Sequence, residues 1–259
     1  MPGRDRLRAE FAAAVCGAEP GLAVANRLCH MCVDLLEVDG AAISLVRAGT
    51  TQGTFGSSNA LSRRLDEYQF TFGEGPCLDS VAHARAIHCP DLGDPSEARW
   101  PAYAGAVLKE GVRAVYALPV AINTTYIGAL DLFRTVPGPL DALDLTGALL
   151  AAELAALPLL DLMSADVDWA AIEAGDPWSQ LASLERVEVY QATGMLIARL
   201  GVGPTEALVR LRAHAFAHGM TASAVAWAIV RRELVLEADD PWPNPHPTAD
   251  SDSDPGAPQ

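Results

Sequence analysis

The stretch that decides the fold of the C-terminal part reads Leu184-Glu-Arg-Val-Glu-Val-Tyr-Gln-Ala-Thr-Gly-Met-Leu-Ile-Ala-Arg-Leu200, followed by Gly201-Val-Gly-Pro-Thr-Glu-Ala-Leu-Val-Arg-Leu-Arg-Ala-His-Ala215. Three short helices are predicted here. Gly203 and Pro204 indicate the start of the second, with Pro at its first position, and Thr221 is suited to cap the third. Apolar residues recur at helical spacing in all three, as in the core of a small helical bundle. They are Leu196, Leu200, Leu208, Leu211, Ala215, Val225 and Ile229.

This helical segment differs in charge from the rest of the chain. Residues 184–236 contain six Arg and four Glu, a net charge of +2, whereas residues 1–183 carry −11 and residues 237–259 carry −6. The whole chain of 259 residues has a formal net charge of −15. Because carboxylates repel phosphate, the chain as a whole is not expected to bind nucleic acid or an anionic membrane. A contact with a polyanion is therefore expected only through the Arg-bearing helices.

The same segment resembles the ANTAR domain, the RNA-binding antitermination module at the C-termini of bacterial regulators. The matching positions are Arg186, Gln191-Ala-Thr-Gly-Met-Leu196, Glu206-Ala207, Leu211-Arg212 with Ala215, and 222–230. Thr193 stands where most members of that family have Lys, so a phosphate contact made by that Lys is absent here or is supplied by Arg. The resemblance implies a homodimer that binds paired RNA hairpins in nascent transcripts and prevents formation of a terminator.

The candidates for RNA binding lie outside the predicted helical core. They are Arg186, Tyr190, Gln191, Thr193, Gly194, Arg199, Arg210, Arg212 and His214. We expect Arg186, Arg210 and Arg212 on an exposed face, where Ala substitution changes stability by about 0.5 kcal/mol or less. Tyr190 or His214 could stack on an unpaired base, and Gly194 would permit close approach by another helix or by RNA. A solvated helix face explains any single Arg equally well, and the family resemblance favours RNA for the set.

The N-terminal part is predicted to be an α+β domain. The expected elements are helices near 22–36, 76–83 and 101–110, strands at 40–46, 50–57, 87–90, 113–122 and 126–134, and a long helix at 140–163 broken or kinked at Pro158. Five motifs occur in the order found in GAF domains attached to ANTAR modules in actinobacteria: Phe72-Gly-Glu-Gly-Pro-Cys-Leu-Asp79, Pro90-Asp91-Leu92, Arg99-Trp100-Pro101, Gly111-Val-Arg113 and Leu118-Pro119. This resemblance, over residues 21 to 160, implies a sensor domain whose small-molecule ligand the sequence does not identify.

Other function classes lack the residues they need. Lys109 is the only Lys, which excludes a phosphate-binding loop of the Gly-x-x-x-x-Gly-Lys type and a phosphoacceptor receiver domain. No nucleophile elbow or dinucleotide fingerprint is present, so we do not expect an enzyme. No segment reads as a membrane span, and five cysteines do not suggest a disulfide framework, which together indicate a cytoplasmic protein. The Arg-bearing N-terminus is predicted to be a helix and not a signal peptide.

Cys77 is the one candidate for ligand or redox sensing. It follows Gly73-Glu-Gly-Pro76 at a predicted helix start, where the helix dipole would lower the pKa of a thiol. A buried structural Cys is the favoured alternative, as it is for Cys29 and Cys32. His214 and His218 have the spacing of metal ligands but no third ligand, so no metal site and no cofactor are predicted.

These features predict a GAF-like α+β sensor domain followed by a small all-α ANTAR-like domain. The expected divisions are an N-terminal helix at 1–20, the sensor domain at 21–163, a linker at 164–183, the RNA-binding domain at 184–236 and a disordered acidic tail at 237–259. A stripe of leucines at 140, 143, 150, 154 and 157 is expected to form the dimer contact. Two alternatives stay open, a ligand- or redox-binding sensor with a degenerate output domain and a DNA-binding regulator.

Overall fold

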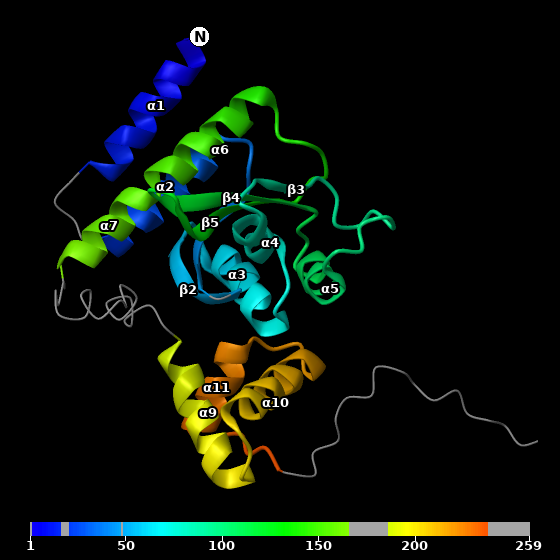
Figure 1. The fold of residues 1–259 in the computed structure, drawn as a ribbon. Coiled ribbons are helices and arrows are strands. Elements are labelled where there is room, and N and C mark those ends of the chain that lie inside the picture. The colour runs from blue at the N-terminus through cyan, green and yellow to red at the C-terminus, as the bar shows by residue number, and fades with distance from the viewer. Residues whose placement is uncertain (1, 17–20, 48, 166–185, 238–259) are drawn as a thin grey trace, which may run out of the picture.

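The computed structural model describes residues 2–16, 21–47, 49–165 and 186–237 (Figure 1). The elements of the N-terminal part are α1 (Pro2–Val15), α2 (Gly21–Leu35), β1 (Gly40–Arg47), β2 (Thr50–Ser57), α3 (Ala60–Phe72), α4 (Pro76–His83), β3 (Ile87–Cys89), α5 (Pro101–Lys109), β4 (Ala114–Ile122), β5 (Thr125–Arg134), α6 (Ala142–Leu154) and α7 (Ala156–Ala165). The C-terminal part contains α9 (Val187–Leu200), α10 (Pro204–Ala217) and α11 (Ala222–Val230). All five predicted strands are confirmed, and only α3 had not been predicted.

A five-stranded antiparallel sheet forms the centre of the N-terminal part, in the order β2-β1-β5-β4-β3. Side chains of a strand alternate between the two faces of a sheet. In β1, Ile43 and Leu45 accordingly face one buried cluster, whereas Ala42 and Val46 face the other. Both faces of the sheet are therefore apolar and both need a covering layer.

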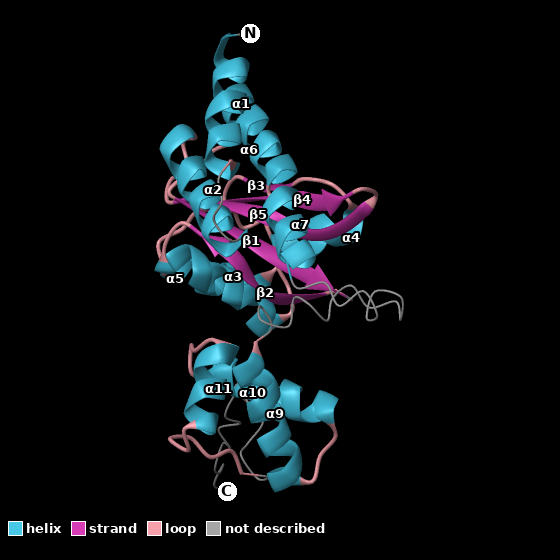
Figure 2. Cartoon of the chain, turned by 90° about the vertical axis from the view of Figure 1, so that its left-hand side faces the viewer, coloured by secondary structure: helices cyan, strands magenta, loops and turns pink. Residues whose placement is uncertain are grey.

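Helices cover the two faces of the sheet in two groups. On one face, α1, α2, α6 and α7 bury a cluster that includes Phe11 and Leu28. On the other face, α3, α4 and α5 bury a cluster that includes Cys77 and Tyr103. Figures 1 and 2 show the sheet lying between these two layers. The result is a three-layer α/β/α arrangement, in which the layer of α3 to α5 is the one nearer to the C-terminal helices.

The apolar C-terminal helix of this domain is interrupted earlier than predicted. It breaks at Ala155, three residues before Pro158, so the proline lies in the first turn of α7, where its missing N–H does least harm. The continuous stretch Ala142–Leu160 is long and apolar enough to cross a membrane, the one such stretch among the residues described. Because 56% of it is buried, it has the character of a core helix.

The leucines of this helix pair do not form one exposed stripe. Leu150 is only 6% exposed and packs in the core, and Leu140 and Leu154 pack partly buried against the same cluster. The prediction that these three lie at an exposed contact was wrong, because they pack against the buried cluster on this face of the sheet. Among residues 142–160, the exposed leucines are Leu143, Leu149, Leu157 and Leu160.

The three C-terminal helices pack against one another as a small bundle. Pro204 is at the first position of α10, and the Thr221 hydroxyl caps α11 by accepting a hydrogen bond from Ala224 N, both as predicted. The predicted core residues are buried in it, with Leu200 and Leu208 partly buried at its edge. Phe70 of α3 also belongs to this buried cluster, although it comes from the N-terminal part of the chain.

Candidate nucleic-acid interface

Arg186, the first candidate for RNA contact, is buried. It immediately precedes α9 and is 7% exposed. Its guanidinium carbon lies 4.4 Å from the centre of the Phe70 ring, and its nitrogens lie 3.9 Å from the carboxylates of Asp66 and Glu67. Nη1 also donates to the Ser223 hydroxyl at 3.4 Å. The prediction of an exposed Arg186 was therefore wrong, because α3 supplies an aromatic face and two acids that cover it.

Arg212 reaches the same aromatic ring from α10. Its guanidinium carbon also lies 4.4 Å from the centre of the Phe70 ring. Burial, and secondarily the positive charge of Arg186, lowers the pKa of Arg212 from its usual value. The exposed position predicted for Arg212 is thus also wrong, since the side chain is half-buried. One phenylalanine therefore contacts two arginines from different helices of the bundle.

Further contacts extend this interface along α3. The Ala222 amide, at the start of α11, donates to the Thr71 hydroxyl at 2.9 Å in a buried hydrogen bond. Phe72 meets Phe216 of α10 edge to face, with ring centres 5.7 Å apart. Together with Phe70, these residues make the C-terminal end of α3 the docking face for the three-helix bundle (Figure 2).

One face of α9 remains open to solvent. Tyr190, Gln191 and Gly194 are all exposed on it, and Tyr190 keeps 57% of its surface accessible. A Cβ built on Gly194 would meet nothing within 4 Å, so no neighbouring helix requires this glycine in the described structure. Thr193 is half-buried beside this face, and its hydroxyl donates to Val189 O at 2.7 Å. The central residues of the predicted RNA motif therefore lie at or near an accessible surface.

The remaining candidates lie farther from the interface. Arg199 is exposed and pairs with Glu237 at 2.6 Å. Arg210 keeps 31% of its side chain exposed and pairs with Glu206 at 2.8 Å, which is the helical pair expected from their spacing. His214 stacks on His218 with ring centres 4.0 Å apart. No group of three potential metal ligands occurs among the described residues.

The other side of α3 joins a buried polar network in the core. Asp66 accepts hydrogen bonds from the Ser44 and Thr54 hydroxyls of β1 and β2. Gln69 donates to the Asp131 carboxylate at 2.7 Å and accepts from the Cys77 amide at 2.8 Å. One helix therefore connects the strands and the start of α4 to the docking face that holds Arg186.

Cys77 lies within this network and is fully buried. Burial, followed by the nearby carboxyl groups of Asp131 and Asp66, raises the pKa of the Cys77 thiol well above its usual value. The buried position agrees with the favoured interpretation of a structural Cys77, and the lowered pKa of the other interpretation is not found, because desolvation outweighs the dipole of the short helix α4. Cys29 and Cys32 are fully buried as well, as in the structural alternative, and burial raises the pKa of Cys32 to about 12.

Asp131 gives a pH-dependent prediction. Burial, and secondarily Asp66, raises its pKa well above 3.8, so the folded chain keeps a proton that the unfolded chain loses as the pH rises. Relative to Asp131→Asn, the free energy of unfolding of the wild type should fall by up to ~1.4 kcal/mol per pH unit as the pH rises above about 4, the ordinary pKa of an aspartate. Urea denaturation of both proteins at several pH values measures this. A difference that does not change with pH would contradict a neutral Asp131.

Comparison with known families identifies both parts of the chain. The family model of the GAF domain matches residues 21–159, which is more than half of the chain. The protein belongs to the GAF domain family. The model of the ANTAR domain matches residues 180–230, which include α9, α10 and α11. The chain is thus a GAF domain followed by an ANTAR domain, and the buried contact of Arg186 with α3 is a contact between the two.

Solved GAF domains are similar to the N-terminal part at low identity. A GAF domain from an Acinetobacter phosphoenolpyruvate-protein phosphotransferase is 9% identical, with a TM-score of 0.47 over 64% of this chain and 96% of that one. The A. aeolicus nlh2 GAF domain in an inactive state is 14% identical, with a TM-score of 0.45 over 61% and 96% of the two chains. No curated protein matches the chain.

Proposed function

We propose that this protein is a transcription antitermination regulator that binds hairpin RNA through its ANTAR domain under the control of its GAF domain. The observation that carries this proposal is the ANTAR match over residues 180–230, within which Tyr190, Gln191 and Gly194 lie on the open face of α9. The local charge of +2 in a chain of −15 supports a polyanion as the partner of this part alone. Paired hairpins in nascent transcripts are the target that the family resemblance implies.

We further propose that the described conformation is the form with low RNA affinity. Arg186 and Arg212 are candidates for phosphate contact, yet the GAF helix α3 covers the first and half-buries the second. A guanidinium held against Phe70 cannot also release counterions from a phosphate backbone. Separation of the ANTAR domain from α3 would expose both arginines beside the open face of α9, and would raise the affinity for RNA.

Helix α3 is suited to control this separation. Asp66 and Gln69 hold it to β1, β2, β5 and α4 through buried hydrogen bonds, and Phe70 and Thr71 hold it to the ANTAR domain. A ligand that shifts the packing of the GAF core would therefore move both ends of this connection. Because interfaces of this kind are bistable, a small shift of the helix is enough to favour the open form.

The proposed location, the lack of enzymatic activity and the domain boundaries are inferred from the two domain types. GAF and ANTAR domains are sensor and regulatory domains, and we propose a cytoplasmic regulator without enzymatic activity. The boundaries proposed for the sensor domain (21–163) and the RNA-binding domain (184–236) stay predictions. Nearly all of the proposed linker (164–183) and tail (237–259) lies outside the described residues.

Two rival functions are less well supported. A DNA-binding role would place α11 in the major groove, but Ala222–Val230 contains no Arg, Lys, Asn or Gln to read bases. A redox-sensing role would need a reactive thiol, whereas Cys77 is buried with a raised pKa.

The full chain should bind a two-hairpin RNA with an affinity that falls as salt rises. Because each phosphate contact releases counterions, two to four contacts should make the affinity fall by roughly 10-fold or more when salt rises from 50 to 200 mM. Fluorescence anisotropy with labelled RNA measures this, and a DNA duplex of equal length is the control. Equal or stronger binding of the duplex would contradict the assignment to RNA.

The dimer contact is proposed to lie on the outer face of α6 and α7. Leu157 and Leu160 are 45% and 42% exposed there, and Leu149 lies on the same helix pair. We expect Leu157→Asp with Leu160→Asp to convert a dimer into a folded monomer, because a carboxylate opposes apolar association. Sedimentation velocity at micromolar concentration checks this, with Val136→Asp as the control at an exposed residue outside both helices. A wild-type monomer that binds two-hairpin RNA normally would rule out this contact.

A further inference from the structure

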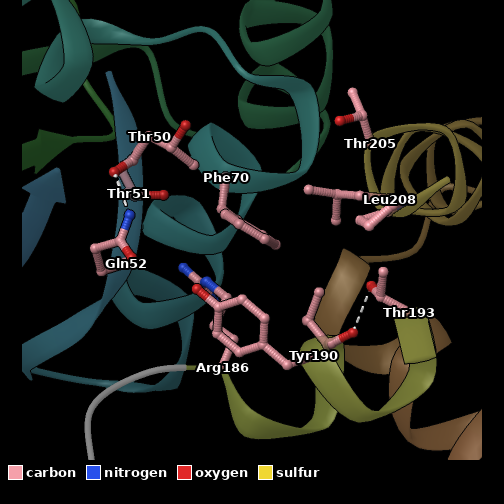
Figure 3. Close-up of a pocket in the computed structure, with 11 residues that line it drawn as sticks. Thr50, Thr51, Gln52, Phe70, Arg186, Tyr190, Thr193, Thr205 and Leu208 are labelled. Atoms are coloured by element: carbon pink, nitrogen blue, oxygen red, sulfur yellow. Dashed lines mark hydrogen bonds between the residues drawn. The ribbon is translucent and has the colours of Figure 1, made fainter. Parts of the chain in front are cut away.

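A cavity of about 260 Å³ lies between the GAF and ANTAR domains. Its GAF wall is formed by β2 and by Phe70 of α3, and its ANTAR wall by the segment from Arg186 through α9 and by the start of α10. Figure 3 shows the Arg186 guanidinium directed towards Phe70 and the β2 side of this cavity, with Thr51 and Gln52 opposite. Because both domains contribute walls, the complete cavity exists only while they are in contact.

Buried hydrogen-bond donors at this cavity lack acceptors. Within the described residues, Nε and Nη2 of Arg186 and the hydroxyl of Thr51 have no hydrogen-bond partner, although Arg186 is 7% exposed and Thr51 fully buried. The nearest carboxylates, Asp66 and Glu67, stay 3.9 Å from the guanidinium. Asp66 already accepts from two hydroxyls, and neither carboxylate comes within hydrogen-bond distance of the guanidinium. Buried donors of this kind are normally satisfied.

The rest of the lining is suited to a small apolar body. Val189, Tyr190, Pro204 and Leu208 join Phe70 around the cavity. Water in the liquid takes ~30 Å³ per molecule, so the volume holds roughly nine non-hydrogen atoms. A ligand that satisfies the donors must present acceptor oxygens at one end, and the charge of Arg186 favours an anionic group.

We propose that this cavity is a binding site for a small aromatic carboxylic acid, whose carboxylate bonds to Arg186 and to the Thr51 hydroxyl and whose ring lies among Phe70, Val189 and Leu208. Such a ligand binds only the closed arrangement of the two domains. It therefore raises the ratio of closed to open molecules by a factor of one plus its concentration divided by its dissociation constant. The walls also select against inorganic phosphate, which has no apolar body to replace water there.

The test uses the full chain and benzoate, which has nine non-hydrogen atoms, as the probe. Isothermal titration should give a dissociation constant on the order of 1 mM or below for benzoate. Benzamide, its neutral analogue, and inorganic phosphate should each bind at least about tenfold more weakly, because they lack the charge or the apolar body. If benzamide or phosphate binds as well as benzoate, or if benzoate does not bind, the proposal is overturned.

Two substitutions locate the binding. Thr51→Val removes one hydroxyl at nearly constant volume and should weaken benzoate binding by roughly fivefold, and Arg186→Gln should weaken it by tenfold or more. Thr125→Val is the matched control, at an exposed Thr of β5 outside the cavity. Benzoate binding that is unchanged in Thr51→Val would place the acid elsewhere and would overturn the proposal, even if Arg186→Gln failed to fold.

The regulatory consequence rests on the proposed RNA function. Benzoate at ten times its dissociation constant should lower the RNA affinity of the wild type by up to about tenfold and have a smaller effect on Thr51→Val. The titrations with benzoate contain no RNA, so their outcome does not depend on whether the protein binds RNA. Benzoate that binds in the cavity and raises RNA affinity would contradict a ligand that holds the domains closed.

Discussion

Phe70→Ala should raise the affinity of the full chain for two-hairpin RNA by on the order of tenfold to a hundredfold. The ring of Phe70 is 7% exposed and contacts both Arg186 and Arg212. Its removal costs the closed form about 1.5–3 kcal/mol of apolar burial and ~0.5–2 kcal/mol for each cation–π contact. When a binding-competent form is rare, each tenfold gain in its population lowers the apparent dissociation constant tenfold, and the gain ends once that form predominates. The salt dependence of binding should also become steeper, because both arginines become available to phosphate.

The control for Phe70→Ala is a substitution that weakens the GAF core without touching the interface. Val107→Ala serves, because Val107 of α5 is fully buried in the cluster on the α3 side of the sheet. It should lower the thermal midpoint and leave RNA affinity within about twofold of the wild type. If Phe70→Ala leaves RNA affinity unchanged while hydrogen exchange shows that the Ala222 amide has lost protection, the interface does not control RNA binding.

Leu150→Asp should abolish folding of the GAF domain. The side chain is 6% exposed and packs against the sheet, so the substitution removes a buried leucine and leaves a carboxylate without a partner. We expect a loss of more than ~4 kcal/mol, which is most of the stability of an ordinary domain. Circular dichroism and thermal denaturation measure it.

The neighbouring residue gives the matched control for Leu150→Asp. Leu149 is 51% exposed on the same helix, and Leu149→Asp should keep the fold and change stability by about 0.5 kcal/mol or less. Equal stability of the two variants would mean that α6 does not pack against the sheet through Leu150. Loss of folding in Leu149→Asp would instead show that this leucine is covered in solution, as at a subunit contact.

Much of the fold was predictable because local patterns determine it. The largely apolar run at 40–46 forms β1, an inner strand between β2 and β5 with apolar residues on both faces. Gly111 follows the helix 101–109 with φ of 81°, the left-handed conformation expected of a glycine after a helix end. In the ANTAR domain, Pro204 and Thr221 begin α10 and α11 as expected. In each case the signal lies within a few residues of the element it determines.

Helix α3 was not predicted, although its sequence contains a helical pattern and an N-cap residue. Leu61, Leu65, Tyr68 and Phe72 have helical spacing, and Asn59 precedes them as an N-cap whose side chain accepts from Ser62 N. Charged residues between these positions, together with Phe70 on the opposite face, obscure the amphipathic pattern. Phe70 is apolar on an otherwise polar face because it packs against another domain. The sequence of α3 alone does not reveal this contact.

The exposure of the candidate site could not be predicted for a related reason. Arg186 and Arg212 were placed at the surface because their own helices leave them outside the bundle core. Their burial depends on Asp66, Glu67 and Phe70, which lie more than a hundred residues earlier in the chain. In contrast, the pair Glu206–Arg210 depends only on helical spacing and was predictable. Pairings between distant elements need the tertiary structure.

The place of Phe70 in the ANTAR core has a consequence for how the protein is synthesised. Residues 60–72 leave the ribosome long before residues 186–237, and domains generally fold as units with the N-terminal one first. When α9 to α11 emerge, the GAF domain already presents the aromatic ring that completes their buried cluster. The ANTAR domain should therefore assemble on the GAF surface during translation, so that a newly made molecule is first in the closed form.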